Sequence, residues 1–464
     1  MKYRLLGRTG TESPNRKIFR AALTVGFLTL VTKLGTTVKE LVVAQWFGRG
    51  DALDAFLIAF LVPWFVLNVV VGAIGSALIP TFVATRQKQG TEVAQKLFAS
   101  VMLVSLLLLT SIAILLAVLA PFYLPYLGSS FSAEKLHLTR ELLYVLLPFI
   151  LFNGVLTCAA AVLNAGEKFA APALAPLLTP VATILLIETA AGKWGAFTLA
   201  GGVVAGSILE AALLMAALRA HGMRFSLKWH GLSSELRTVL GQYMPMLAAT
   251  FLAGGTSVVD QSMAAMLQPG SVAALSYANK IVSVITALGV TALGTAVLPY
   301  FSKMVASNDW NGCRHTLKRY SVLVVAGSVP IAVALMVFAK PVVRILFQRG
   351  AFTSADTELV SWVEICYAIQ IPFFVWSTLF VRLLSAMHRN RVLMYCAAIN
   401  LLLDIVLNVV LMRAMGIAGI ALSTSLVFVF TFLFLGGWSL RLVVGQLRVQ
   451  RGLRLRHRCY LPRL

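Results

Sequence analysis

The stretch TKLGTTVKELVVAQWFGRGDALDAFLIAFLVP, residues 32–63, ends one long apolar run and begins the next. Only the Gly-Arg-Gly-Asp segment at 48–51 separates the two runs. A helix that crosses a bilayer needs about 20 consecutive, mostly apolar residues, and both runs reach that length. The stretch therefore predicts two membrane-spanning helices joined by a tight turn.

Apolar runs of this length recur along the whole chain. Of its 464 residues, 59% are hydrophobic and only 12% are charged, about half the charge of a soluble domain. We therefore predict an all-α integral membrane protein with about 12 transmembrane helices. The predicted spans are 19–47, 54–83, 97–121, 139–164, 171–190, 195–218, 238–267, 272–301, 317–339, 359–386, 393–412 and 416–440.

The basic residues indicate how the chain is oriented. The formal net charge is +22, which in a soluble protein would suggest nucleic acid. Here 26 Lys and Arg fall in the segments on the side of the N-terminus, and eight fall in the segments on the other side. Because loops rich in Lys and Arg stay inside, we expect both termini to be cytoplasmic. The expected partners of these charges are membrane lipids rather than nucleic acid.

The two halves of the chain resemble each other. Pro80-Thr81-Phe82 ends the second predicted span and Pro299-Tyr300-Phe301 ends the eighth, an offset of about 220 residues. Six spans per half predict two pseudo-symmetric six-helix lobes around a central cleft, which is a transporter architecture. The predicted units are a basic N-terminus (1–18), an N-lobe (19–221), a cytoplasmic linker (222–237), a C-lobe (238–440) and a basic cytoplasmic tail (441–464).

Three lysines lie well inside predicted spans of both halves, namely Lys33, Lys39 and Lys280. A charge near the bilayer centre costs about 2.5–3.5 kcal/mol on insertion scales, so each needs a physical reason. Lysines that face a shared cavity would attract an anionic cargo such as a phosphate. We therefore predict that these three residues bind the substrate.

Acidic and amide residues also occur within the spans. Interhelical ion pairs, helix packing, a cavity wall and coupling to Na⁺, H⁺ or the membrane potential all remain open for them. The candidates are Glu40, Asp54, Asp260, Asn400, Asp404 and Asn408.

No enzyme or cofactor site is indicated. The sequence lacks G-x-S-x-G, H-E-x-x-H and G-x-x-x-x-G-K-[ST] patterns. The five cysteines form no CxxC pair, and the six histidines have no metal-ligand spacing. We expect a transporter without a metal site or bound cofactor.

Several motifs resemble those of the lipid II flippase family (MviN/MurJ type). They are the opening stretch 32–63 with ALIPTFV (77–83), SYANKIVSV and ALGTAVLPYFSK within 276–303, ILFQRGAFTSADTELV (345–360), and the stretch from the tenth span to ALSTSL (421–426). The resemblance implies the fold of the multidrug/oligosaccharidyl-lipid/polysaccharide exporter superfamily. It also implies the flipping of an undecaprenyl-pyrophosphate-linked saccharide from the cytoplasmic to the outer leaflet.

This chain departs from the family pattern at informative positions. The family's functional arginines match Lys33, Lys39 and Lys280, which keep the charge but lack the bidentate fork of Arg. Leu67-Asn68 replaces a double-arginine region, and the two further C-terminal spans of the family are replaced by a basic tail. These departures favour a relative that flips a repeat unit for exopolysaccharide, O-antigen or capsule, with contacts to the enzymes that synthesise it.

Two other functions agree less well with the sequence. A cation-coupled multidrug exporter of the same superfamily would need an acidic, aromatic-lined cavity, which the lysines disfavour. A membrane glycosyltransferase, polymerase or ligase would need catalytic residues on a large outer loop, and the predicted outer loops are short. Alternating access of the two lobes around a lipid-linked saccharide is the function that we predict.

Overall fold

The computed structural model describes residues 14–166, 168–223, 228–387 and 389–459, and within them some side chains, such as those of 14–25, 291–299 and 451–459, are not described. Helices make up the described chain, without a strand. Residues 1–13 and 460–464, which belong to the predicted basic N-terminus and tail, lie outside the described residues.

The first half of the chain forms one group of helices. They are α1 (Pro14–Phe47), α2 (Asp51–Val66), the π-helix η1 (Leu67–Val71), α3 (Gly72–Gln89), α4 (Thr91–Leu127), α5 (Ala133–Ala165), α6 (Ala170–Leu174), the 3₁₀-helix η2 (Ala175–Leu177), α7 (Leu178–Trp194) and α8 (Phe197–Ala220).

The second half forms a matching group. It comprises α9 (Ser234–Ala264), α10 (Ser271–Ala306), α11 (Trp310–Val337), α12 (Ala339–Phe347), α13 (Ser354–Ala368), α14 (Gln370–Ala386), α15 (Asn390–Met415) and α16 (Ile417–Cys459).

The predicted all-α membrane fold is confirmed. Ten helical stretches among the described residues are long and apolar enough to cross a membrane, and each coincides with a predicted span. The first and seventh predicted spans correspond to α1 and α9. Helix α12 was not predicted, because its nine residues are too few for a span. The helix α16 also continues past residue 440, where we expected the tail to begin, as far as Cys459.

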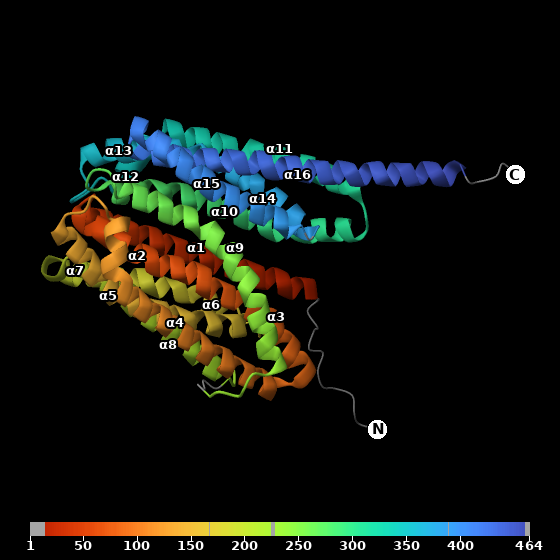
Figure 1. Cartoon of the computed structure of the whole chain (residues 1–464), viewed down its shortest axis with the longest axis horizontal. Coiled ribbons are helices and arrows are strands. Elements are labelled where there is room, and N and C mark those ends of the chain that lie inside the picture. Colours follow the sequence, from red (N-terminus) through yellow and green to blue (C-terminus); the bar gives the residue numbers. More distant parts are fainter. Residues whose placement is uncertain (1–13, 167, 224–227, 388, 460–464) are drawn as a thin grey trace, which may run out of the picture.

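The helices are arranged as two lobes (Figure 1). Helices α4, α5 and α8 pack together in the first lobe, and α10, α14 and α16 pack together in the second. The lobes lie close together at the end that holds the turn between α1 and α2, which we call the closed end. They diverge toward the opposite end, which holds the start of α1 and the end of α16 and which we call the terminal end.

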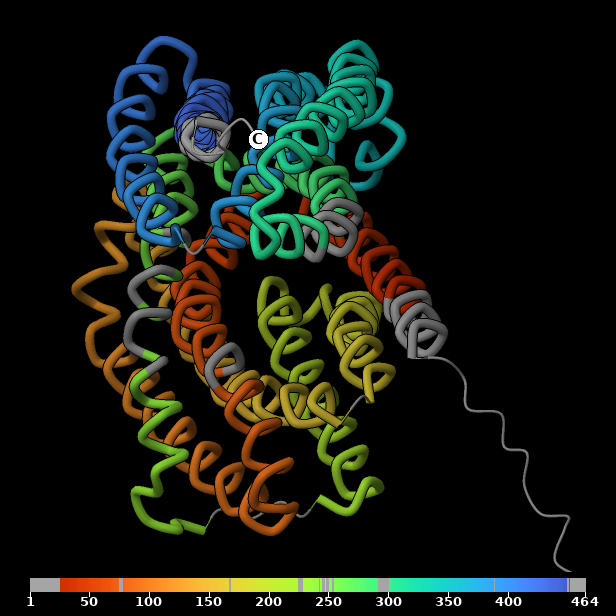
Figure 2. Tube along the Cα trace, turned by 90° about the vertical axis from the view of Figure 1, so that its right-hand side faces the viewer, coloured from red at the N-terminus to blue at the C-terminus, as the bar shows by residue number. Residues whose placement is uncertain are grey.

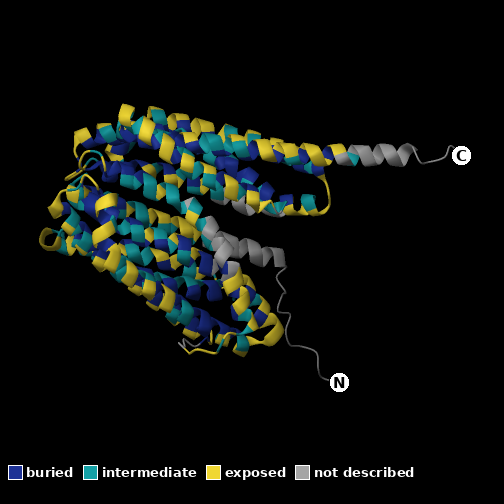
Figure 3. Cartoon of the chain, viewed as in Figure 1, coloured by how far each residue is buried: buried dark blue, intermediate teal, exposed yellow. Residues whose placement is uncertain are grey.

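Burial follows what a lipid environment requires (Figure 3). Many large apolar side chains are exposed, among them Leu107, Ile114 and Phe122 on α4, with Phe122 69% exposed. A soluble protein would cover such a surface, whereas acyl chains solvate it. The polar side chains inside the lobes are therefore the ones that need an explanation.

The helix α9 passes from one lobe to the other (Figures 1 and 2). Its first part contacts α3, α4 and η1, and it also packs along α15 of the second lobe. A Cβ at Gly254 would touch Phe65 of α2, whereas one at the next residue, Gly255, would touch Leu401 of α15. The Gly254-Gly255 pair therefore marks the point where α9 changes its packing partner.

The π-helix η1 is where α9 docks on the first lobe. A π-helix disturbs the regular i→i−4 bonding, and such segments are frequent at functional sites. Two hydroxyls of α9 donate to carbonyl oxygens of η1: Tyr243 Oη to Val70 at 3.3 Å and Thr250 Oγ1 to Val69 at 3.1 Å. These bonds satisfy backbone groups that lipid could not.

Candidate functional site

An ion-pair cluster joins the two lobes. Glu40 of α1 is buried, and its Oε1 lies 2.9 Å from Lys39 Nζ and 3.1 Å from Lys280 Nζ. Lys39 and Glu40 belong to α1 in the first lobe, and Lys280 belongs to α10 in the second. The structure therefore brings together two of the three lysines predicted to bind substrate, and it gives them one shared carboxylate.

Lys33 lies about two turns nearer the terminal end on the same face of α1 as Glu40, because seven residues make nearly two helical turns. Its side chain is exposed, and it has no hydrogen-bond or ion-pair partner among the described residues. A backbone contact orients the helix here: Thr32 Oγ1 donates to Ala173 O of α6 at 3.1 Å. We call Lys33, Lys39, Glu40 and Lys280 the charge cluster.

The charge cluster keeps an excess of positive charge. Glu40 neutralises one ammonium group, so three lysines and one carboxylate leave a formal charge of +2. An ammonium group away from bulk water attracts an anion far more strongly than it does in water. The arrangement can hold a dianionic group between the lobes, since the carboxylate positions two of the lysines without cancelling the whole cluster.

The closed end is held by a second set of contacts, beginning with Asp54 of α2. Its carboxylate accepts hydrogen bonds from Gly270 N at 2.6 Å and Ala273 N at 2.8 Å, and so caps the N-terminus of α10 in the opposite lobe. Lys135 of α5 lies 3.1 Å from the same carboxylate. Asp54, a candidate coupling or cavity-wall residue, thus lies in an interlobe cap.

Three further contacts cross between the lobes beside Asp54. Arg49 Nε donates to Asp356 Oδ1 at 2.8 Å, at the start of α13. Tyr277 Oη donates to Gly48 O at 3.0 Å, and Ala351 N donates to Gln45 O at 2.8 Å. Together with the Asp54 cap, these contacts make up what we call the latch.

Glycines permit the close backbone approach in the latch. Gly48 and Gly350 have φ values of 52° and 57°, a conformation that other residues seldom adopt. A Cβ at Gly48 would clash with the carbonyl oxygen of Ala351, and one at Gly350 with that of Gln45. Both the backbone conformation and the available space therefore require glycine here.

A separate polar cluster lies inside the second lobe. Asp260 of α9 accepts hydrogen bonds from Asn408 Nδ2 at 2.8 Å and Thr424 Oγ1 at 3.0 Å. Asp404 lies close enough to interact with Asp260, yet neither of its side-chain oxygens accepts a hydrogen bond from the described residues. Two facing buried carboxyl groups cannot both be ionised without a cation or a shared proton.

The side chains of the predicted polar stripe on α15 therefore contact two different sets of neighbours. Asp404 and Asn408 belong to the carboxyl cluster, which also includes Asp260 and Thr424. Asn400 instead donates to Thr431 Oγ1 of α16 at 2.9 Å. A helical stripe predicts a shared face, but which neighbouring helix each side chain meets depends on packing.

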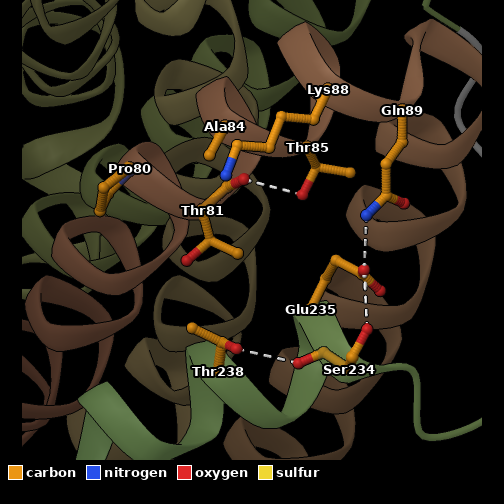
Figure 4. A pocket seen from close by; sticks show the side chains of 9 residues that line it. All are labelled: Pro80, Thr81, Ala84, Thr85, Lys88, Gln89, Ser234, Glu235 and Thr238. Atoms are coloured by element: carbon orange, nitrogen blue, oxygen red, sulfur yellow. Dashed lines mark hydrogen bonds between the residues drawn. The ribbon is translucent and has the colours of Figure 1, made fainter.

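A groove at the terminal end lies between α3 and α9 (Figure 4). It has a volume of about 320 Å³ and is lined by Pro80, Thr81, Ala84, Thr85, Lys88, Gln89, Ser234, Glu235 and Thr238. Gln89 Nε2 donates to Glu235 Oε1 at 2.8 Å, and this bond, together with hydrogen bonds from the start of α9, lowers the pKa of Glu235 to about 2. None of the predicted site residues lines the groove, which instead belongs to the docking of α9 on the first lobe.

Most of the latch was not predicted from the sequence. Arg49, Lys135, Tyr277 and Asp356 are not among the predicted site residues. The available signal was the pair of Arg-Gly motifs at 49–50 and 349–350. Nothing in the sequence alone pairs Arg49 with a residue 307 positions away.

Comparison with known families settles what the chain is related to. The family model described as "Lipid II flippase MurJ" matches residues 43–448, nearly the whole chain. The chain belongs to the MurJ family. This family consists of transporters rather than enzymes, as the absence of catalytic motifs led us to expect.

Relatives and solved structures agree with this assignment. A probable lipid II flippase MurJ from Synechocystis sp. is 24% identical over 462 residues, covering 92% of this chain and 85% of the relative. The lipid II flippase MurJ of Burkholderia cenocepacia is 27% identical over 365 residues, covering 76% and 70%.

The solved structures share the fold. A lipid II flippase MurJ in an inward closed conformation has a TM-score of 0.77 at 23% identity, covering 93% of this chain and 92% of that one. A multidrug resistance MATE transporter in an inward-facing conformation has a TM-score of 0.73 at 13% identity, covering 92% and 99%. The MurJ-family chain thus shares its two-lobe fold with transporters of different cargo, and its cargo must be argued from its own charges.

Proposed function

We propose that this MurJ-family protein is a flippase that moves an undecaprenyl-pyrophosphate-linked saccharide across the bacterial inner membrane. The observation that carries the proposal is the charge cluster, in which Lys39 and Lys280 come from opposite lobes and share Glu40. A diphosphate diester carries about two negative charges, which matches the +2 that remains on the cluster. A cationic drug would be repelled there, which disfavours a multidrug exporter.

The proposed mechanism is alternating access. We propose that the terminal end faces the cytoplasm, because the described basic segments at that end, such as those with Lys88, Lys318 and Arg391, outweigh those at the closed end. With the latch closed, the diphosphate head would enter between the diverging lobes while the polyprenyl chain stays in lipid. The latch would then open as the terminal end closes, and the head would leave on the outer side.

We further propose that the carboxyl cluster of Asp260, Asp404, Asn408 and Thr424 provides the coupling. Two buried carboxyl groups with amide and hydroxyl oxygens beside them offer oxygen ligands for Na⁺ or a site for a shared proton. Binding there would link an ion gradient or the membrane potential to the packing of α9 against α15. A charge moved through 100 mV supplies about 2.3 kcal/mol.

We propose that the substrate is lipid II or a lipid-linked repeat unit of exopolysaccharide or O-antigen. The first follows from the relatives' names, and the second from the lysines at the family's arginine positions, since Lys binds phosphate as a point charge without the bidentate fork. Contacts with the enzymes of that biosynthesis would be made at the cytoplasmic end.

A reconstituted flipping assay tests the proposal. Purified protein in vesicles should move fluorescent lipid II or a lipid-linked repeat unit between leaflets, and Lys280→Ala should slow the movement at least about tenfold. Lys318→Ala, an exposed lysine at the terminal end, is the matched control and should leave the rate unchanged. The proposal fails if neither lipid moves faster than in empty vesicles, or if Lys280→Ala matches the wild type.

A further inference from the structure

Helix α13 carries a buried polar stripe that the proposed mechanism does not use. Thr357, Ser361 and Glu364 follow one another at helical spacing and are 1%, 5% and 0% exposed. The stripe runs inward from Asp356, which belongs to the latch. At 1.5 Å per residue, Glu364 lies about 12 Å below Asp356 along the helix.

Hydroxyl groups connect this stripe to the surface at the closed end. Thr357 Oγ1 donates to Gln348 Oε1 at 3.1 Å, and Gln348 is half-buried in the segment between α12 and α13. Ser361 Oγ donates to Thr357 O at 2.5 Å, one turn deeper. The polar stripe therefore extends from the surface of the closed end toward Glu364.

Glu364 is the innermost residue of the stripe, and its carboxyl group has no hydrogen-bond partner among the described residues. Its neighbours along the helix, Val360 and Val363, belong to the apolar core. An unpaired carboxylate in such surroundings is strongly unfavourable, so the neutral acid is the form that this packing accommodates.

Among the described side chains, no charged group on the helices packed around α13 pairs with Glu364. Helix α13 contacts α10, α11, α12, α14 and α16. Among the described side chains, the titratable groups on these helices and on α13 are Tyr277, Lys280, Tyr300, Lys303, Cys313, Arg314, His315, Lys318, Arg319, Tyr320, Lys340, Arg344, Asp356, Glu358, Cys366, Tyr367, Arg382, Arg441 and Arg448. None of them forms an ion pair or hydrogen bond with Glu364.

We propose that Glu364 is a proton-binding site that exchanges with the outer face through Ser361 and Thr357. With the latch closed, the carboxyl holds its proton. When the latch opens, water enters along the stripe, the O–H bond of the acid breaks, and the proton passes to water at the outer face. The ionised carboxylate is then solvated, and it must bind a proton again before the latch can close.

This site gives the latch a defined pH dependence. Because the closed state holds the proton and the open state can release it, a rise in outer pH favours the open state. Between the proton affinities of the two states, each pH unit changes the ratio of open to closed by up to about tenfold. The proposal uses the outward orientation of the closed end, but it needs no substrate.

Distances between spin labels across the latch test the proposal without any cargo. Labels at Tyr126→Cys in the first lobe and Ile345→Cys in the second would report on the closed end, since these side chains are 79% and 73% exposed. Cys459→Ser removes the one cysteine outside the described side chains, while Cys158, Cys313, Cys366 and Cys396 are buried. Raising the pH from about 6 to about 9 should lengthen the label distance in the otherwise wild-type protein.

Two variants on one helix decide the outcome. Glu364→Gln has the shape of the neutral acid, so it should fold and keep the short distance at every pH. Glu358→Gln is the control, because Glu358 is exposed and pairs with Lys340 at 2.7 Å; it should keep the wild-type response. A wild-type distance that ignores pH, or a Glu364→Gln protein that still responds, overturns the proposal. Failure of the flipping assay alongside a normal pH response would overturn only the proposed function.

Discussion

Lys280 of α10 and Glu40 of α1 lie 3.1 Å apart, and this ion pair joins the two lobes of the protein. Lys39 approaches the same carboxylate to 2.9 Å. A bound diphosphate would compete with Glu40 for both lysines, so loading with substrate would change a contact between the lobes. This relationship connects the charge of the cargo to lobe movement.

Replacing Glu40 tests that competition. Glu40→Gln removes the counter-charge and should raise the affinity for undecaprenyl pyrophosphate by about tenfold, because no carboxylate then competes for the lysines. The same variant should flip more slowly, since the head would be released less readily. Titration binding in detergent and the flipping assay measure the two effects. A fall in affinity would show instead that Glu40 mainly positions the lysines.

The Arg49–Asp356 pair should stabilise the closed latch. Arg49→Ala removes a pair whose side chains are 22% and 10% exposed, at a cost of about 1–3 kcal/mol. The open population at the closed end should therefore rise at least about fivefold, as measured by the spin-label distances.

Arg349→Ala is the matched control for Arg49→Ala. Its guanidinium donates to Ile345 O of α12 at 2.8 Å, and among the described residues its side chain makes no hydrogen bond or ion pair across the lobes. It should leave the label distances unchanged. If the two arginine variants behave alike, the interlobe ion pair does not hold the latch.

Asp54 should matter more for stability than its neighbour Asp51. Asp54→Ala removes the cap of α10, and loss of a helix cap costs about 0.5–2 kcal/mol. The Asp51 side chain is 62% exposed and pairs with Lys135, so Asp51→Ala should cost less. Thermal unfolding in detergent ranks the two variants. An equal loss would show that the cap contributes little.

The hydroxyls that α9 offers to η1 should stabilise the docking of α9 on the first lobe. The double variant Tyr243→Phe with Thr250→Val removes the donors to Val70 O and Val69 O, at about 1–3 kcal/mol for each unsatisfied carbonyl. Hydrogen exchange at 67–71 should increase. Thr238→Val, whose hydroxyl donates to Ser234 O within α9, should leave exchange there unchanged.

The carboxyl cluster should confer the ion dependence of transport. Asp404→Asn leaves Asp260 with its two donors but removes the second carboxyl, so Na⁺ or pH should no longer change the flipping rate. Asn400→Ala, on the same helix but bonded to Thr431, should retain the dependence. Rates measured with and without Na⁺, at two pH values, make the comparison. Retained dependence in Asp404→Asn would place coupling elsewhere.

The membrane fold and the two-lobe organisation were predictable from the amino-acid sequence alone. Apolar runs of about 20 residues can only span a bilayer as helices, because lipid offers no partners for backbone polar groups. The same cost of burying charge identified Lys33, Lys39 and Lys280 as residues that needed a reason.

Which of these groups contact one another depends on how the helices pack. Glu40 pairs with two lysines, and Asp54 caps a helix of the opposite lobe. Asn400 bonds to Thr431 of α16 rather than joining Asp404 in the carboxyl cluster. Helical spacing defines the face on which a side chain lies, but not the neighbouring helix that this face meets. Contacts between residues more than 200 positions apart depend on how the two lobes pack, and no local pattern in the chain records that packing.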